Sequence, residues 1–426
     1  MEDNRAVSVI IASENSSADR GQTHSTGCSH YLYPMSRIKQ AMHIGYSPRN
    51  RVELLRGGRP YFSRLEQMIQ AATTSLHLQF YIFEPDDTGD RIIEQLRAAA
   101  KRNVSVHLHL DAYASARLDN KRVSSLRDAG VEVKWFEPLL RSTRFYVGRR
   151  LHHKIVVADG IKLLIGGLNI CDRYNDLPNQ PAWFDLAAYL EGETAYIAYH
   201  QCRLLWGEKE LPPRIEWKAI DAFGDQILKA QQKDCRLRYN DWVRRKREIT
   251  RSYLEQFQHA EKNILICCSY FLPGRLLRKK IAQARKRNVR IRLILTGVSD
   301  VPLAKAAERH LYRWMLERGI EIYEYQSNVL HAKAATIDDH WTTIGSYNLN
   351  EISALASLEA NLDVKDQNFA LVTRLLLEEV IRKDCKRIDP LAYSQYTGFF
   401  DRIGQRASFY LIHAVLRLFT FYFRQE

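Results

Sequence analysis

The sequence predicts an α/β protein made of two similar halves, and three observations support this fold class. First, one pattern occurs twice, as HHKIVVADGIKLLIGGLN at 152–169 and as HAKAATIDDHWTTIGSYN at 331–348. Second, the segments around each copy also repeat. Third, alternating apolar runs that fit strands are separated by runs with helical spacing. Strands separated by helices indicate parallel pairing in an α/β sandwich.

The expected elements follow the same order in both halves: strand, helix, strand, helix, strand, and then the motif. Helical spacing is found in LEQMIQAA and IIEQLRAAAK of the first half and in LLRKKIAQARK of the second. The stretches that recur between the halves are 75–83 with 263–272, 96–113 with 281–298, and 129–137 with 318–326. The repeat therefore extends well beyond the motif.

The repeat divides the chain into segments of ordinary domain length. We expect the first half to span 49–205 and the second half 250–388. Between them, 206–249 is rich in charge and contains Pro212-Pro213, which is typical of a connector. The polar segment 1–48 is predicted to be disordered or membrane-proximal, and 389–426 is predicted to be a separate amphipathic tail.

Each motif copy is expected to form a hairpin. The apolar run after the histidine is a strand, Asp159-Gly160 is a tight turn, and KLLIGG is the returning strand. Because alternate side chains of a strand share a face, His152 and Lys154 point the same way, and the hairpin brings Asn169 back opposite His152. The second copy repeats this arrangement with His331, Lys333, Ser346 and Asn348.

If the halves pack with pseudo-two-fold symmetry, the two hairpins face each other across one site. Lysines and amides suit the oxygens of a phosphoryl group. Two histidines suit stepwise displacement, in which one attacks phosphorus and the other protonates the leaving oxygen. No carboxylate cluster for Mg²⁺ accompanies the motifs, so we expect neither a metal nor a cofactor. Asp159 and Asp338 are candidates for the catalytic set, or they act only in the turn.

The charge and cysteine content of the chain limit the classes of molecule that it is expected to bind and the compartment in which it is expected to lie. The 426 residues carry 63 Lys+Arg against 49 Asp+Glu, a net charge of +14, which favours nucleic acid or anionic lipid. The seven cysteines form no CxxC pair, which indicates a reducing compartment. We identify no secretory signal and no run of apolar residues long enough to cross a bilayer.

The duplicated HxKxxxxD resembles the signature of the phospholipase D superfamily over residues 50–388. The resemblance implies a fold of two fused sandwich halves with the active site between them. It also implies that His152 is the nucleophile, that His331 is the general acid and then the base, and that the motif lysines hold the phosphate. The same phosphate-binding role is implied for Asn169, Asn348 and Ser346, and a histidine-orienting role for Asp185 and Glu359.

Within the superfamily the chain is most similar to bacterial cardiolipin synthases of the short peripheral type. The similar stretches include QFYIFEPDDTG (79–89), IGGLNICDRY (165–174) and AWFDLAAYLEG (182–192). The resemblance implies phosphatidyl transfer between phospholipids at an anionic membrane surface, on the cytoplasmic face of a bacterial inner membrane. A phospholipase D hydrolase and a nuclease or other phosphodiesterase remain alternatives, although nucleic acid is not the expected partner. The oligomeric state stays open.

The tail FFDRIGQRASFYLIHAVLRLFTFYFRQE (399–426) is too short and too polar to span a bilayer. On a helix at 100° per residue it forms a narrow basic stripe on an otherwise apolar, aromatic cylinder. Two interpretations follow. The helix lies in the plane of the membrane interface, with its arginines among anionic headgroups, or it packs on the protein's own core.

Overall fold

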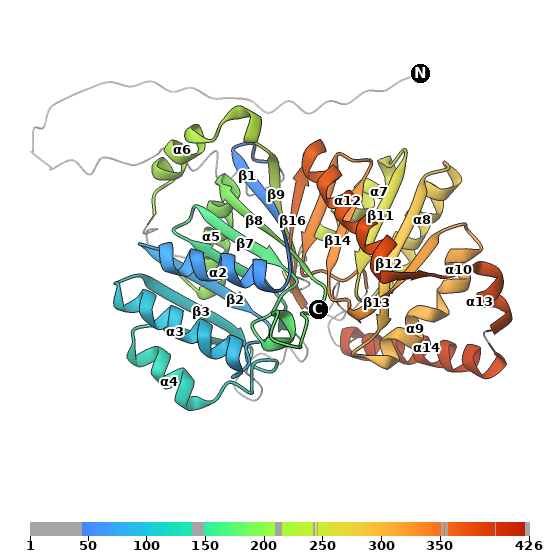
Figure 1. Cartoon of the computed structure of the whole chain (residues 1–426), viewed down its shortest axis with the longest axis horizontal. Coiled ribbons are helices and arrows are strands. Elements are labelled where there is room, and N and C mark those ends of the chain that lie inside the picture. Colours follow the sequence, from blue (N-terminus) through green and yellow to red (C-terminus); the bar gives the residue numbers. More distant parts are fainter. Residues whose placement is uncertain are drawn as a thin grey trace, which may run out of the picture.

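Each repeated half forms one mixed β-sheet, and the two sheets lie side by side (Figure 1). The computed structural model describes residues 45–138, 149–208, 215–241, 243–244, 246–350, 353, 357–396 and 398–421. The predicted fold class, two fused α/β halves, is confirmed. The parallel pairing expected from the βαβ pattern holds for the strands joined by helices, whereas the motif hairpins and their neighbours pair antiparallel.

The first sheet has the order β1-β8-β7-β6-β2-β3-β4. Its strands are β1 (Asn50–Arg56), β2 (Ser75–Phe80), β3 (Ser105–Asp111), β4 (Glu132–Phe136), β6 (Lys154–Ala158), β7 (Lys162–Gly166) and β8 (Leu186–Gly192). The core on its outer face is closed by α2 (Arg59–Ala71), α3 (Asp87–Lys101) and α4 (Asn120–Asp128). On the inner face lies α5 (Glu193–Trp206), and the short η1 (Asp172–Tyr174) follows β7.

The second sheet has the order β10-β9-β16-β15-β14-β11-β12-β13-β17. Its strands are β9 (Asp234–Asp241), β10 (Lys246–Arg247), β11 (Asn263–Cys268), β12 (Arg290–Val298), β13 (Glu321–Val329), β14 (Lys333–Ile337), β15 (Trp341–Gly345), β16 (Ser357–Lys365) and β17 (Cys385–Arg387). The outer-face helices are α7 (Glu248–His259), α8 (Arg275–Lys286), α9 (Pro302–His310) and α10 (Tyr312–Leu316), and α12 (Gln367–Asp384) packs on the inner face.

The segment 206–249, predicted as a connector, contains α6 (Trp217–Gln226), η2 (Lys229–Gln231), β9 and β10. β9 pairs antiparallel with β16, in the same way that β1 pairs with β8. Polar residues alternate with apolar ones in β9 (DCRLRYND), which is a strand signal that we passed over because the segment is rich in charge. Part of this segment therefore completes the second sheet.

The halves share one hydrophobic core. The cluster that contains Val157 and Leu190 of the first sheet also contains Leu265 and Leu362 of the second, together with residues of α5 and α12. One strand crosses the boundary: β5 (Arg150–Leu151), from the first half, pairs in parallel with Ser357–Leu358 of β16. The two halves therefore cannot separate without exposing apolar side chains to water.

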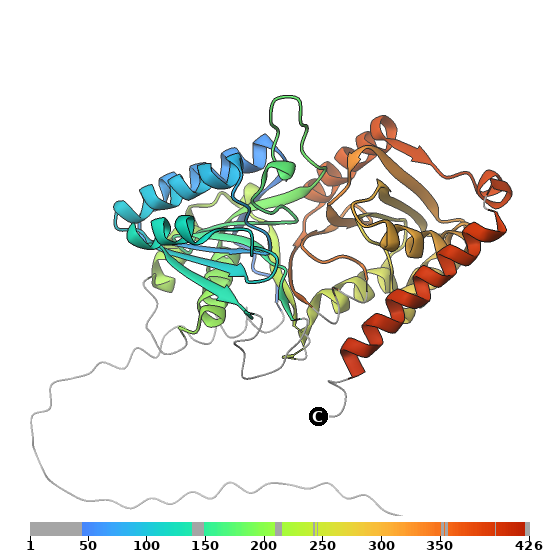
Figure 2. The same ribbon diagram turned by 90° about the horizontal axis from the view of Figure 1, so that it is seen from below.

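The tail forms α13 (Pro390–Tyr396) and α14 (Phe399–Phe421), and α14 lies along α9 on the outside of the second half (Figures 1 and 2). Phe409 and Ile412 pack against the core of the second half. Among the described helices, α14 included, none combines the length and apolar character needed to cross a bilayer.

The motif aspartates close the far ends of the hairpins. Asp159 adopts a left-handed φ of 51° and accepts hydrogen bonds from the backbone N–H groups of Thr73, Thr74 and Ser75, at 2.7–3.0 Å. Asp338, at φ 52°, accepts from the N–H groups of residues 261–263 in the same way. Each carboxylate therefore fastens the hairpin turn to the start of the neighbouring strand, and the full length of β6 or β14 separates it from the motif histidine.

We predict that Asp159→Ala and Asp338→Ala each lower the free energy of unfolding by about 2 kcal/mol, because three backbone donors lose a charged acceptor. Chemical denaturation followed by circular dichroism measures the change. Asp128→Ala, at an exposed position in α4, is the matched control and should lie within about 0.5 kcal/mol of the parent. Variants of wild-type stability that lose transfer activity would instead place these aspartates in the catalytic set.

Candidate functional site

The two motif histidines lie at the boundary between the halves. The backbone N–H of each donates to a backbone carbonyl of the opposite half. The N–H of His152 donates to the carbonyl of Leu358 at 3.0 Å, and the N–H of His331 donates to the carbonyl of Phe184 at 2.8 Å. The strands β6 and β14 begin two residues after these histidines. The main chain beside each histidine is therefore fixed by the opposite half.

The side chains are crossed in the same manner. Nδ1 of His152 lies 2.9 Å from Oε2 of Glu359, and Nδ1 of His331 lies 2.7 Å from Oδ2 of Asp185. Both carboxylates are completely buried. Since each carboxylate accepts the Nδ1 proton, the neutral imidazole keeps an unprotonated Nε2. The family resemblance implied that these two carboxylates orient the motif histidines, and in the structure each contacts the histidine of the other half.

Both motif lysines lie against the histidine backbone. Nζ of Lys154 donates to the carbonyl of His152 at 2.8 Å, and Nζ of Lys333 donates to the carbonyl of His331 and to Oγ of Ser269. Both lysines are 1% exposed. Burial lowers the pKa of Lys154 to about 7 and also lowers the pKa of Lys333. A bound phosphodiester would compensate this cost, because its anionic oxygens favour the charged ammonium groups.

The surroundings of both motif histidines lower their pKa values. Burial lowers the pKa of His152, although the Glu359 carboxylate opposes the shift. Burial and then the ammonium groups of Lys333 and Lys154 hold the pKa of His331 well below its usual value. Neutral imidazole is the form that attacks phosphorus. An anionic group bound between the rings would favour the imidazolium form of either ring.

The residues predicted to bind phosphate beside the histidines are partly occupied by protein contacts. Asn169 accepts from the N–H of Ile82 at 3.0 Å and donates to the hydroxyl of Tyr174 at 3.0 Å. Oδ1 of Asn348 lies 3.9 Å from Sγ of Cys268. Ser346 donates to Oε2 of Glu359 at 2.5 Å. These side chains line the site and hold its geometry, and their contact with a phosphate stays a prediction.

The first motif has Gly166-Gly167 where the second has Gly345-Ser346, and this difference has a steric cause. A Cβ at Gly167 would lie 2.4 Å from Oδ1 of Asp185, so no side chain fits there. At the equivalent position of the second motif, Ser346 hydrogen-bonds the longer Glu359 instead. The choice between glycine and serine therefore follows the length of the orienting carboxylate.

Sequence reasoning missed the aromatic residues around the histidines. The ring of Tyr81 meets His152 edge-on at 4.8 Å, and that of Tyr174 meets His331 edge-on at 5.0 Å. Trp183 lies 6.2 Å from His331. Tyr81 directly follows β2, beside the motif strand, and such positions at the carboxyl ends of strands are the signal that could have identified it.

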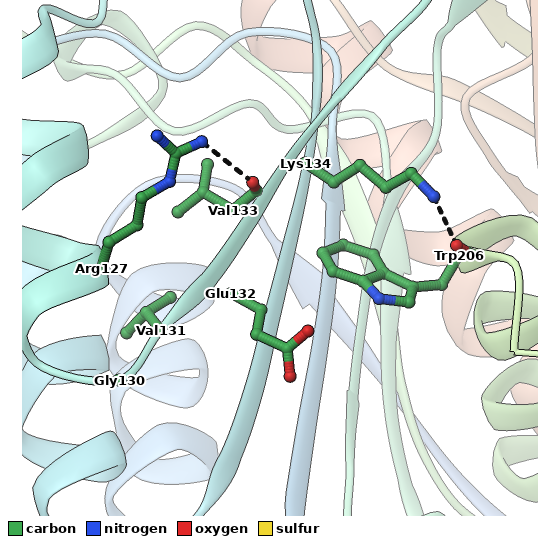
Figure 3. Close-up of a pocket in the computed structure, with 7 residues that line it drawn as sticks. All are labelled: Arg127, Gly130, Val131, Glu132, Val133, Lys134 and Trp206. Carbon is green, nitrogen blue, oxygen red and sulfur yellow. Dashed lines mark hydrogen bonds between the residues drawn. The ribbon is translucent and has the colours of Figure 1, made fainter. Parts of the chain in front are cut away.

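The remaining described residues offer few competing sites. One group could hold a metal ion, Glu84, Asp86 and Cys171. Its carboxylates already bind Arg173 and the N–H groups of Gly89 and Asp172. A surface hollow at the edge strand β4, lined by Lys134, Trp206 and their neighbours, contains no motif residue (Figure 3). Neither feature joins the histidine site.

Comparison with known proteins gives consistent results. The family model described as "Cardiolipin synthase, PLD-like domain" matches residues 65–180 and 253–379. Cardiolipin synthase B of Escherichia coli (strain K12) is 32% identical over 343 residues, covering 80% of this chain and 82% of that protein. Minor cardiolipin synthase ClsB of Bacillus subtilis (strain 168) is 28% identical over 334 residues, covering 78% and 81%.

Solved structures share the fold. The crystal structure of phosphatidylserine synthase from Haemophilus influenzae Rd KW20 superimposes with a TM-score of 0.66, covering 89% of this chain and 97% of that one. Polyphosphate kinase from Porphyromonas gingivalis gives a TM-score of 0.56, over 80% of this chain and 48% of the kinase. Identity is 16% in both cases, so these structures support the architecture alone.

We predict that Asp185→Asn and Glu359→Gln each lower kcat by about 10²–10⁴-fold, because the neutral amide no longer stabilises the imidazolium of the opposite half. The kcat of the double variant should be only slightly lower than that of the less active single variant, because the effects of residues that act as a unit are not additive. Initial rates measured for all three variants test this. Glu94→Gln, at an exposed position in α3, is the control. Losses that simply multiply would contradict the shared function of the crossed pairs.

Proposed function

The chain belongs to the phospholipase D superfamily, in the cardiolipin synthase family, and we propose that it transfers a phosphatidyl group between phospholipids. The acceptor is a hydroxyl of a second lipid headgroup, phosphatidylglycerol for example. The observation that carries this proposal is the pair of crossed histidine–carboxylate contacts, with a buried lysine beside each histidine. Such a site complements a phosphodiester on both of its faces.

The proposed reaction has two displacements. Nε2 of His152 attacks phosphorus while His331 gives its proton to the leaving headgroup oxygen, so a P–N bond forms as a P–O bond breaks. The acceptor hydroxyl then loses its proton to His331 as its oxygen attacks the phosphohistidine, which restores His152. The lysine ammonium groups offset the charge of the non-bridging phosphate oxygens, the work that a metal ion does in other phosphoryl-transfer sites.

The substrates reside in a bilayer, and the surface of α14 suits one. Away from its contact with α9, the helix exposes three apolar side chains, with exposed fractions of 73% for Phe399, 84% for Phe400 and 52% for Leu411. Arg402 and Arg406 are also exposed. Aromatic rings at the acyl boundary and arginines among anionic headgroups favour interfacial binding. We therefore propose that the protein is peripheral, on the cytoplasmic face of the membrane, and that α14 both packs on the second half and contacts lipid.

The decisive assay supplies labelled phosphatidylglycerol in mixed micelles with excess EDTA. We expect label in a product that contains two phosphatidyl groups, with release of glycerol. Label in phosphatidic acid alone would identify a hydrolase instead. Cleavage of a single-stranded oligonucleotide, with lipid untouched, would identify a nuclease. A strict need for added Mg²⁺ in the chemical step would contradict catalysis by the lysines and histidines.

The assignment of the nucleophile predicts where a covalent adduct forms. His331→Ala should trap a phosphatidyl group on His152, since acceptor activation is lost, whereas His152→Ala should form no adduct. Both variants should lose transfer by about 10³-fold or more. Protein incubated with labelled lipid, denatured at alkaline pH because the P–N bond is acid-labile, and mapped by mass spectrometry gives the site. An adduct on His331 would reverse the two roles.

The role of α14 predicts a loss of vesicle binding without a loss of fold. The triple variant Phe399→Ser, Phe400→Ser and Leu411→Ser should bind anionic vesicles at least about tenfold more weakly, because it removes apolar area that would enter the interface. Leu228→Ser and Leu375→Ser remove similarly exposed leucines on other elements and should bind as the parent does. Unchanged sedimentation of the triple variant with vesicles would place the contact surface elsewhere.

A further inference from the structure

Tyr174 makes a contact that the two-histidine scheme leaves unexplained. It lies in η1 and is 1% exposed, and its hydroxyl is 3.3 Å from Nε2 of His331, the reactive nitrogen. The hydroxyl also accepts from Nδ2 of Asn169 at 3.0 Å, and Asn169 is held by the N–H of Ile82 at 3.0 Å. Because Nδ1 of His331 donates to Asp185, Nε2 of the neutral ring is an acceptor, and the Tyr174 hydroxyl donates to it.

This contact breaks the pseudo-symmetry of the site. The copies of the motif are 179 residues apart, which places Ser353 at the position equivalent to Tyr174. Among the described residues, the ring of His152 contacts Glu359 through Nδ1 and the ring of Tyr81 edge-on, with no hydroxyl at its Nε2. One histidine therefore has a phenol at its reactive nitrogen, and in the described structure the other does not.

We propose that Tyr174 is a positioning residue that holds Nε2 of His331 in its unprotonated, accepting form and so makes the two histidines inequivalent. A hydrogen bond donated to the lone pair lowers the reactivity of His331 as a nucleophile, whereas the lone pair of His152 stays available to attack phosphorus. After His331 has protonated the leaving oxygen, the Tyr174 hydroxyl donates a hydrogen bond to the unprotonated Nε2 until the acceptor hydroxyl binds. The proposal rests on the proposed function, because it assigns roles within that reaction.

The hydrogen bond from Tyr174 changes the pKa of His331, and the direction of the change depends on which protonation state of the imidazole accepts the bond. A donor to the lone pair stabilises neutral imidazole, so Tyr174 lowers the pKa of His331, in the same direction as burial. Burial holds the pKa of Tyr174 itself well above its usual value, so the phenol remains a donor. The other titratable or charged groups that act on His331 are Asp185, Lys333, Lys154, His152 and Asp300. None of these is altered by removing one hydroxyl.

The test is Tyr174→Phe in the full chain, which deletes the hydroxyl and keeps the ring. Tyr196→Phe is the matched control, since it also removes a buried hydroxyl, the one that donates to the carbonyl of Ile215 at 2.9 Å. Histidine ring ¹⁵N NMR, with His331→Gln to assign the signal, reads the tautomer and midpoint of His331 without substrate. The dependence of kcat/KM for the lipid donor on pH reads the same group in the reaction.

In Tyr174→Phe we expect the midpoint of His331 to rise by about 0.5–1 pH unit, the equivalent of one hydrogen bond. The limb of the kcat/KM profile that reports His331 should move to higher pH by the same amount, while the other limb stays in place. Tyr196→Phe should change neither. A shift of both limbs together would overturn the role assigned to His331. An unchanged midpoint, or a uniform fall in rate without a shift, would overturn the proposal.

The NMR measurement separates this proposal from the proposed function. If the midpoint moves as expected but the wild-type protein transfers no phosphatidyl group, the positioning role stands and the proposed reaction fails. If transfer occurs and the midpoint does not move, the reaction stands and the positioning role fails.

Discussion

The crossed hydrogen bonds between each motif histidine and the carboxylate of the opposite half are the contacts on which the rest of the structure depends. A short bond between a buried carboxylate and an imidazole fixes ring orientation and tautomer together. Because Asp185 contacts His331 and Glu359 contacts His152, neither half contains both a motif histidine and the carboxylate that orients it. The shared core and the pairing of β5 with β16 hold the halves in register to within the tolerance of those bonds.

The site also illustrates how buried charges balance when no metal is invoked. Two lysines and two carboxylates are buried together, with two histidines between them. Burial alone disfavours every charged form, which is why the pKa of Lys154 falls and that of Asp185 rises to about 6. A phosphodiester that binds in this environment adds negative charge, which favours the protonated form of each lysine. Substrate binding and activation of the site are thus the same electrostatic event.

The sequence predicted the parts of this molecule that depend on local pattern. The motif hairpins and the order of strands and helices follow from periodicity and from the internal repeat, whereas the two orienting carboxylates were implied only by the resemblance to the family. Even the repeated KRNV has a structural cause, since Asn103 and Asn288 adopt left-handed φ values of 66° and 65° just after α3 and α8. The crossing of the histidine partners was not predictable, because it depends on how the halves dock. The contact of Tyr174 with His331 joins residues 157 positions apart, and no periodicity encodes it.

The exchange between β5 and β16 also sets when the protein can become active during its own synthesis. Arg150 and Leu151 are synthesised long before their strand partners Ser357 and Leu358. His152 likewise precedes its partner Glu359 by 207 residues. Contacts so distant along the chain form late, because the intervening loop entropy must be overcome first. A nascent first half, though it carries a full motif, holds a histidine without its carboxylate. The contact between His152 and Glu359 can therefore form only after β16, the last strand but one of the second sheet, has been synthesised.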